Sequence, residues 1–95
     1  MVAKIRKMTS FQELEDMFIP EAREDLRKLV EGARYIVVYQ NMDLSSPWCG
    51  VRSALKVGPG CQVQTLSEAL QGSIHDPVSG RLSPVAYWES PEKVN

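Results

Sequence analysis

The chain has 95 residues, of which 43% are hydrophobic and 24% are charged, and its formal net charge is −1. This length fits one domain with a modest core, and the composition is that of an ordinary globular protein. The near-zero charge gives no general attraction to nucleic acid, and the longest apolar run, residues 35–39, is far too short to cross a bilayer. We therefore expect a single domain over residues 1–90 and a frayed tail over residues 91–95.

The first third of the chain carries helix signals. Ser10 stands three residues before Glu13. It directly precedes Phe11, where apolar residues begin to recur at helical spacing. Thr9 and Gln12 have the same spacing, so either pair supplies a capping box. The pattern predicts a helix that begins near Phe11.

Pro20 interrupts this helical pattern. It lacks the N–H of an intrahelical hydrogen bond but suits the first turn of a helix, so it predicts either a second helix or a kink in one continuous helix. Apolar residues then recur at spacings of three and four until Gly32, where we expect the helix to end.

Beyond Gly32 the pattern becomes extended. Residues 34–41 are apolar on both faces and predict a buried strand, whereas residues 50–57 alternate and predict a strand with one face toward water. Residues 58–60 read Gly-Pro-Gly and predict a turn. Residues 61–65 alternate weakly, and we expect them to pair with residues 50–57 as a hairpin.

The last third of the chain contains a turn and a strand. Residues 76–80 place Pro and Gly as a type I turn requires, so they link a short strand around Ile74 to a strand at residues 85–89. Pro84 suits the beginning or the edge of that strand. Residues 67–72 fit either one capped helical turn or an extended run, and the pattern does not separate the two.

The order of these elements predicts an α+β fold. Two N-terminal helices, or one kinked helix, should pack on one face of a three- to five-stranded, mainly antiparallel sheet. The open face and the edge of that sheet are then the places where a partner, a second copy or a ligand can bind.

The candidate catalytic residues are Cys49, Cys61 and His75. In the predicted hairpin the two cysteines lie about 25 Å apart, at about 3.3 Å per residue, which is too far for a disulfide. A dyad of His75 with either thiol would make a cysteine enzyme, but no local signature supports it. We favour ordinary packing roles for both thiols and no enzymatic activity.

Metal and cofactor sites are not predicted. The cysteines and the single histidine contain no close pair, which a zinc site needs. Residues 58–60 lack the Lys and the Ser or Thr of a phosphate-binding loop.

Aromatic side chains give the strongest functional signal, because two short helices cannot cover both faces of the sheet that carries them. The candidate ligand-binding or interface residues are Trp48, Tyr39, Arg52, Tyr87 and Trp88.

We expect a binding or interaction domain that forms a homodimer, or another self-associated state, through the surface or edge of its sheet. The alternative is a small-molecule-binding protein with a pocket between the helices and the sheet near Trp48. Free thiols and the lack of a secretory signal favour the cytoplasm, without nucleic-acid or membrane partners.

Overall fold

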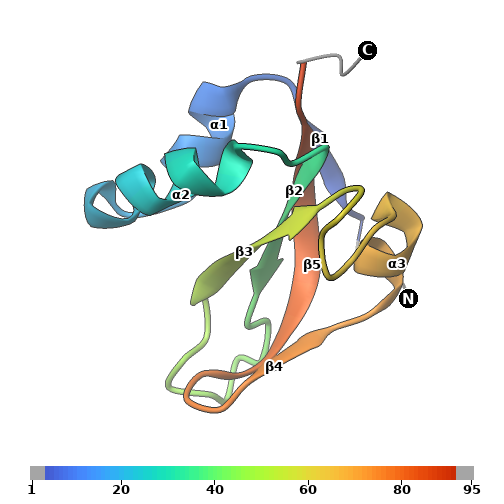
Figure 1. Cartoon of the computed structure of the whole chain (residues 1–95). Helices are drawn as coiled ribbons and strands as arrows, with labels where there is room; N and C mark the ends of the chain where they lie inside the picture. Colours follow the sequence, from blue (N-terminus) through green and yellow to red (C-terminus); the bar gives the residue numbers. More distant parts are fainter. Residues whose placement is uncertain (1–3, 92–95) are drawn as a thin grey trace.

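The computed structural model describes residues 4–91 and shows an α+β fold, which confirms the predicted class. The five strands form a mixed, mostly antiparallel sheet in the order β1-β5-β2-β3, with β4 paired to β5 (Figure 1). The elements in chain order are β1 (Arg6–Met8), α1 (Phe11–Asp16), the 3-10 turn η1 (Pro20–Ala22), α2 (Arg23–Val30), β2 (Tyr35–Gln40), β3 (Arg52–Val57), α3 (Leu66–Gln71), β4 (Ile74–Asp76) and β5 (Gly80–Glu89).

The N-terminal helices form as the capping signals predicted. The Ser10 hydroxyl accepts a hydrogen bond of 3.2 Å from the Glu13 N–H and caps α1. Pro20 opens η1, and the chain bends there before α2. Gly32 follows the end of α2 at a positive φ of 74°, which costs glycine less than any other residue.

The sheet has a core on each face. Successive residues of β2 point to opposite sides, so Ile36 and Val38 pack beneath α1 and α2, whereas Val37 and Tyr39 pack toward α3. The buried residues on the α1–α2 face are Met8, Leu14, Leu26, Ala33, Ile36, Val38, Ala86 and Trp88. Those on the α3 face are Val37, Tyr39, Val57, Ala69 and Leu82.

The predicted hairpin after β3 is wrong. β3 pairs along its whole length with β2, and residues 61–65 contribute only the isolated bridge Val57–Val63. The chain turns at Gly58, where a Cβ would lie 3.0 Å from the Arg34 backbone nitrogen. It then enters α3. The Thr65 hydroxyl accepts a hydrogen bond from the Glu68 N–H and so caps the N-terminus of this helix.

Helices α1 and α2 cover one face of the sheet, as predicted, and α3 adds a cover on the other face. It packs Ala69 and Leu70 on the face opposite α1 and α2, as Figure 1 shows. The buried apolar residues of β2 on that face needed a cover, and α3 supplies part of it. Residues 67–72 thus resolve as a helix that ends before Gly72.

The strand order also differs from a simple meander. The short β1 was not predicted. It pairs with β5 in parallel and lies at the opposite end of the strand order from β3. β5 begins at Gly80 rather than near residue 85 and lies between β1 and β2. Pro84 falls inside β5 at an irregular register beside Tyr39, where a bulge tolerates the missing N–H. Of the predicted tail, residues 92–95 lie outside the described part of the chain.

Candidate interaction surface

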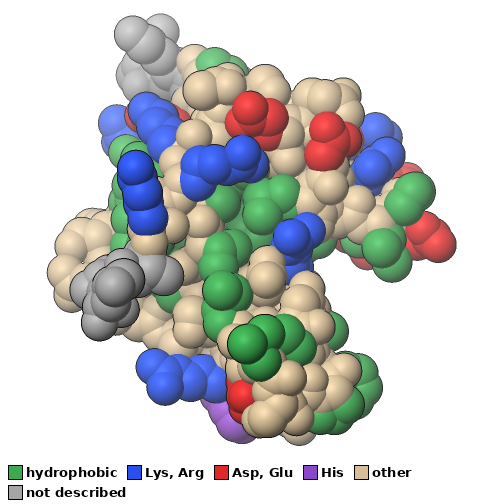
Figure 2. All heavy atoms as spheres, turned by 180° about the vertical axis from the view of Figure 1, so that it is seen from behind, with side chains coloured by type: hydrophobic (Ala, Val, Ile, Leu, Met, Phe, Trp, Pro, Cys, Tyr) green, Lys and Arg blue, Asp and Glu red, His purple; other side chains and the backbone are tan. Residues whose placement is uncertain are grey.

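Exposed apolar side chains gather at the end of the sheet farthest from α1. They lie on the loop that joins β2 to β3 and on the turn that joins β4 to β5, which are neighbours in space (Figure 1). Figure 2 shows hydrophobic side chains over this end of the molecule. We define the apolar tip as the exposed residues Met42, Leu44, Trp48, Val51 and Val78.

The loop of the apolar tip is held by its own hydrogen bonds. The buried Asn41 side chain donates to the Ser79 carbonyl at 2.7 Å and accepts from the Asp43 N–H at 2.9 Å. Asp43 in turn accepts from the Ser45 hydroxyl and N–H, which lowers the pKa of its carboxyl group below the usual range. These bonds fix the backbone while Leu44 stays 92% exposed.

A free strand edge adjoins the apolar tip. β3 pairs with β2 on one side and ends the sheet on the other, so its second edge has no strand partner among residues 4–91. Val51 of the apolar tip directly precedes β3. Unpaired backbone groups next to exposed apolar side chains are what strand addition requires.

Arg52 braces the start of this edge. Its Nε donates to the Gln40 side-chain oxygen at 2.8 Å, and its Nη1 donates to the Met17 carbonyl at 2.8 Å. Arg52 therefore joins the first residue of β3 to the end of α1, and its role here is structural.

The other predicted interface residues differ in how deeply the fold buries them. Tyr39 and Trp88 are buried, so these two side chains do not contribute to the exposed surface of the apolar tip. The Tyr39 hydroxyl donates to the Ala69 carbonyl at 2.6 Å, and Trp88 packs edge-on against Phe11. Tyr87 is half-buried against Tyr35.

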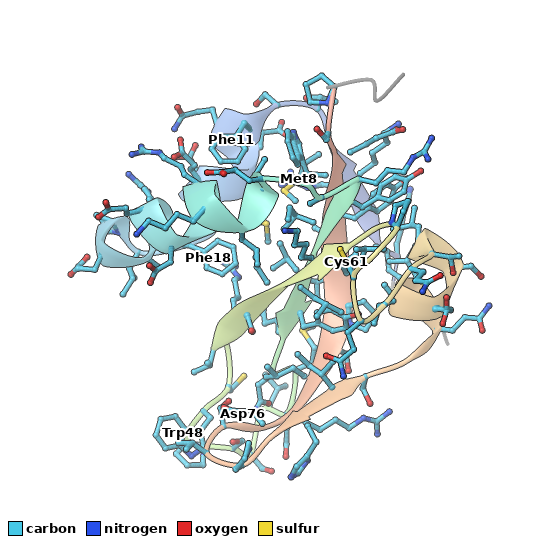
Figure 3. The ribbon with its side chains drawn as sticks, in the orientation of Figure 1. Met8, Phe11, Phe18, Trp48, Cys61 and Asp76 are labelled. Carbon is cyan, nitrogen blue, oxygen red and sulfur yellow. The ribbon has the colours of Figure 1, made fainter. Side chains whose placement is uncertain are left out.

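Trp48 is the predicted aromatic residue that the fold leaves exposed, and Figure 3 shows it at the outer end of its loop. Sequence reasoning singled out Trp48 but missed Met42, Leu44 and Val78. A loop with unusually large apolar residues was the signal that could have identified them.

The sheet carries a hollow of about 350 Å³ beside the apolar tip. Within it the Asp76 carboxylate accepts from the Ser79 hydroxyl and N–H, and these bonds lower the pKa of the Asp76 carboxyl group. The lining residues are Val51, Arg52, Ser53, Ile74, His75, Asp76, Ser79 and Leu82.

The two hollows described here do not include Trp48, the residue beside which a pocket between the helices and the sheet was predicted. A depression on the helical side lies at the opposite end, next to Trp88, with a volume of about 330 Å³. Phe11, Arg27 and Val30 line it from the helices. The apolar tip lies beside the hollow on the other face instead.

The candidate catalytic residues lie on three different segments of the chain. Cys49 is exposed in the loop of the apolar tip, Cys61 lies in the turn before α3, and both thiols are free. Figure 3 shows Cys61 well apart from Asp76, the neighbour of His75. In the described part of the chain no group of three or more His, Cys, Asp or Glu side chains is placed to hold a metal ion.

None of the helices described between residues 4 and 91 combines the length and apolarity needed to cross a membrane. Comparisons with models of protein families, with curated proteins and with solved structures found no match to this chain. The candidate function therefore rests on the molecule's own surface.

Proposed function

We propose that this chain is a small interaction domain that binds a second copy of itself through the apolar tip and the neighbouring edge of β3. The observation that carries the proposal is a loop fixed by Asn41 that presents large apolar side chains to water. A fixed loop loses little conformational entropy on binding, and aromatic and Met side chains are enriched in protein interfaces. In the monomer, the contact of these apolar side chains with water contributes no stability.

The experiment that tests the proposal measures molar mass against protein concentration by light scattering, from about 1 μM to about 1 mM, the range of weak to moderate dimers. The expected result is a rise from the mass of one chain toward two. A mass that stays at one chain over the whole range contradicts the proposal.

Matched serine variants locate the surface. Leu44→Ser and Trp48→Ser should each weaken association by about tenfold or more, since removing an apolar anchor from an interface costs on the order of 1–2 kcal/mol. Ile19→Ser is the control, because Ile19 is as exposed as Val78 but lies between α1 and η1. An equal effect of all three variants would indicate nonspecific adhesion and would count against the apolar tip.

We also propose that the domain works in the cytoplasm. Two free thiols, one of them exposed, suit a reducing compartment. Microscopy of the chain with a small epitope tag tests this, and secretion into the medium would contradict it.

The hollow beside the apolar tip supports a second candidate function, small-molecule binding. Its volume of about 350 Å³ is at the low end of ligand pockets. Both basic and acidic side chains line it, namely Arg52, His75 and Asp76. A panel of small polar metabolites should then include a compound that raises the melting temperature. No shift at millimolar ligand would remove this candidate.

A further inference from the structure

The free edge of β3 has a definite pattern of outward backbone groups, and this inference rests on the proposed self-association. The Asn41 N–H donates to the Val51 carbonyl at 2.9 Å, and the Arg34 N–H donates to the Val57 carbonyl at 2.9 Å. The odd-numbered carbonyls at both ends of β3 thus face β2. Because hydrogen-bonding direction alternates along a strand, Arg52 and Ala54 direct their N–H and C=O groups away from the sheet.

The far end of the same edge is closed. The Gly58 N–H donates to the Val63 carbonyl at 3.1 Å, and Val63 forms a bridge with Val57. A strand that adds to this edge therefore finds its open backbone groups at Arg52 and Ala54, next to the apolar tip.

We propose that two copies of the chain pair through β3 as antiparallel strands, with the two-fold axis passing through Ser53. In this register Arg52 of each copy lies opposite Ala54 of the other. Both pairs are hydrogen-bonded pairs, so each open N–H and C=O of Arg52 and Ala54 gains a partner. The two sheets then form one continuous sheet across the dimer.

The side chains favour the same register. Ser53 of one copy lies opposite Ser53 of the other, and Val51 of each copy lies opposite Leu55 of the other. The side chains of these residues lie on the side of the sheet that carries α3, so the exposed Val51 gains an apolar neighbour. The long Arg52 side chain lies opposite the methyl group of Ala54. It can keep its bonds to Gln40 and to the Met17 carbonyl.

Neighbouring registers are less favourable. An axis through Ala54 places Arg52 opposite Lys56, and an axis through Arg52 places Arg52 opposite itself, so like charges meet directly. An axis through Leu55 needs the backbone of Lys56, which lies at the end closed by Val63.

Cysteine crosslinking tests the register. In a Cys49→Ser, Cys61→Ser background, the variants Ser53→Cys, Ala54→Cys and Leu55→Cys are oxidised at a concentration where light scattering detects the dimer. Position 53 would form a non-hydrogen-bonded pair with Cα atoms about 4.5 Å apart, within the disulfide range. Ser53→Cys should form covalent dimer at least about tenfold faster than the other two, whose symmetry mates lie farther apart in this register.

Each other outcome has a definite meaning. A dimer that crosslinks fastest through position 54 or 55 overturns this register and leaves the proposed self-association standing. Equal rates at all three positions indicate random collision and overturn it as well. A chain that stays monomeric at every concentration overturns the register and the proposed function together.

A second variant distinguishes loss of the dimer from misfolding of the monomer. Proline at position 54 removes an outward N–H but no bond to β2, so Ala54→Pro should abolish the dimer and leave a folded monomer by circular dichroism. Ser53→Pro, which removes an inward N–H, should instead destabilise the monomer. A folded Ala54→Pro variant that still dimerises overturns the proposal.

Discussion

The Asn41 side chain donates a hydrogen bond of 2.7 Å to the carbonyl of Ser79, a residue 38 positions later in the chain. This bond joins the β2–β3 loop to the turn between β4 and β5, and both loops carry residues of the apolar tip. The exposed surface therefore depends on a buried amide.

Replacing Asn41 should loosen both loops. Asn41→Ala leaves the buried Ser79 carbonyl without its donor and should lower the free energy of unfolding by about 1–3 kcal/mol. Urea denaturation measures this change. Ser45→Ala, which alters an exposed bond in the same loop, is the control and should cost less than about 0.5 kcal/mol. Equal losses in the two variants would contradict a central role for Asn41.

Tyr39 should give the protein a distinct alkaline pH dependence. Burial raises the pKa of its phenol, which donates to the Ala69 carbonyl. Above the ordinary value of about 10 the unfolded chain loses this proton while the folded chain retains it, so stability should fall as the pH rises further.

The variant Tyr39→Phe separates this effect from general alkaline denaturation. It should lower the free energy of unfolding by about 1 kcal/mol at neutral pH through loss of the hydrogen bond. It should also flatten the fall in stability above pH of about 10. Tyr87→Phe is the matched control, and an unchanged alkaline slope in Tyr39→Phe would refute the assignment.

The buried carboxylate of Glu15 depends on Arg27. Their Oε2 and Nε atoms lie 2.9 Å apart, and Glu15 is buried in α1 while Arg27 extends from the exposed side of α2. Because Arg27→Met leaves this carboxylate without its charged donor, it should lower the free energy of unfolding by about 1–3 kcal/mol.

An exposed pair provides the comparison. Lys7 and Glu89 lie 3.4 Å apart with both side chains largely in water, so Lys7→Met should change stability by at most about 1 kcal/mol. Thermal unfolding of both variants at pH 7 measures the difference. A larger loss in Lys7→Met would show that burial does not decide the strength of these pairs.

Helix α3 should depend on its N-cap. Thr65→Ala removes the hydroxyl that accepts from the Glu68 N–H at 3.3 Å, and it should cost about 1 kcal/mol. The rate of amide hydrogen exchange should rise more at Ala69 than in β2. Ser67→Ala, inside the same helix, should change neither measurement by a comparable amount.

Local patterns in the sequence were sufficient for α1, α2, β2 and β3. Ser10 and Glu13 marked the start of α1, and the alternation from Val51 to Val57 identified β3 and its two faces. These features depend on residues close together in the chain, where hydrogen-bonding and side-chain periodicity act directly.

Tertiary structure decided the neighbours of each element. Alternation shows which residues share a face, but it does not show that β5 lies between β1 and β2, or that α3 covers Tyr39. For that reason Tyr39 and Trp88 could be predicted at an interface and yet lie in the core. The open edge of β3 has the same origin, because only long-range packing determines which strand is last in a sheet.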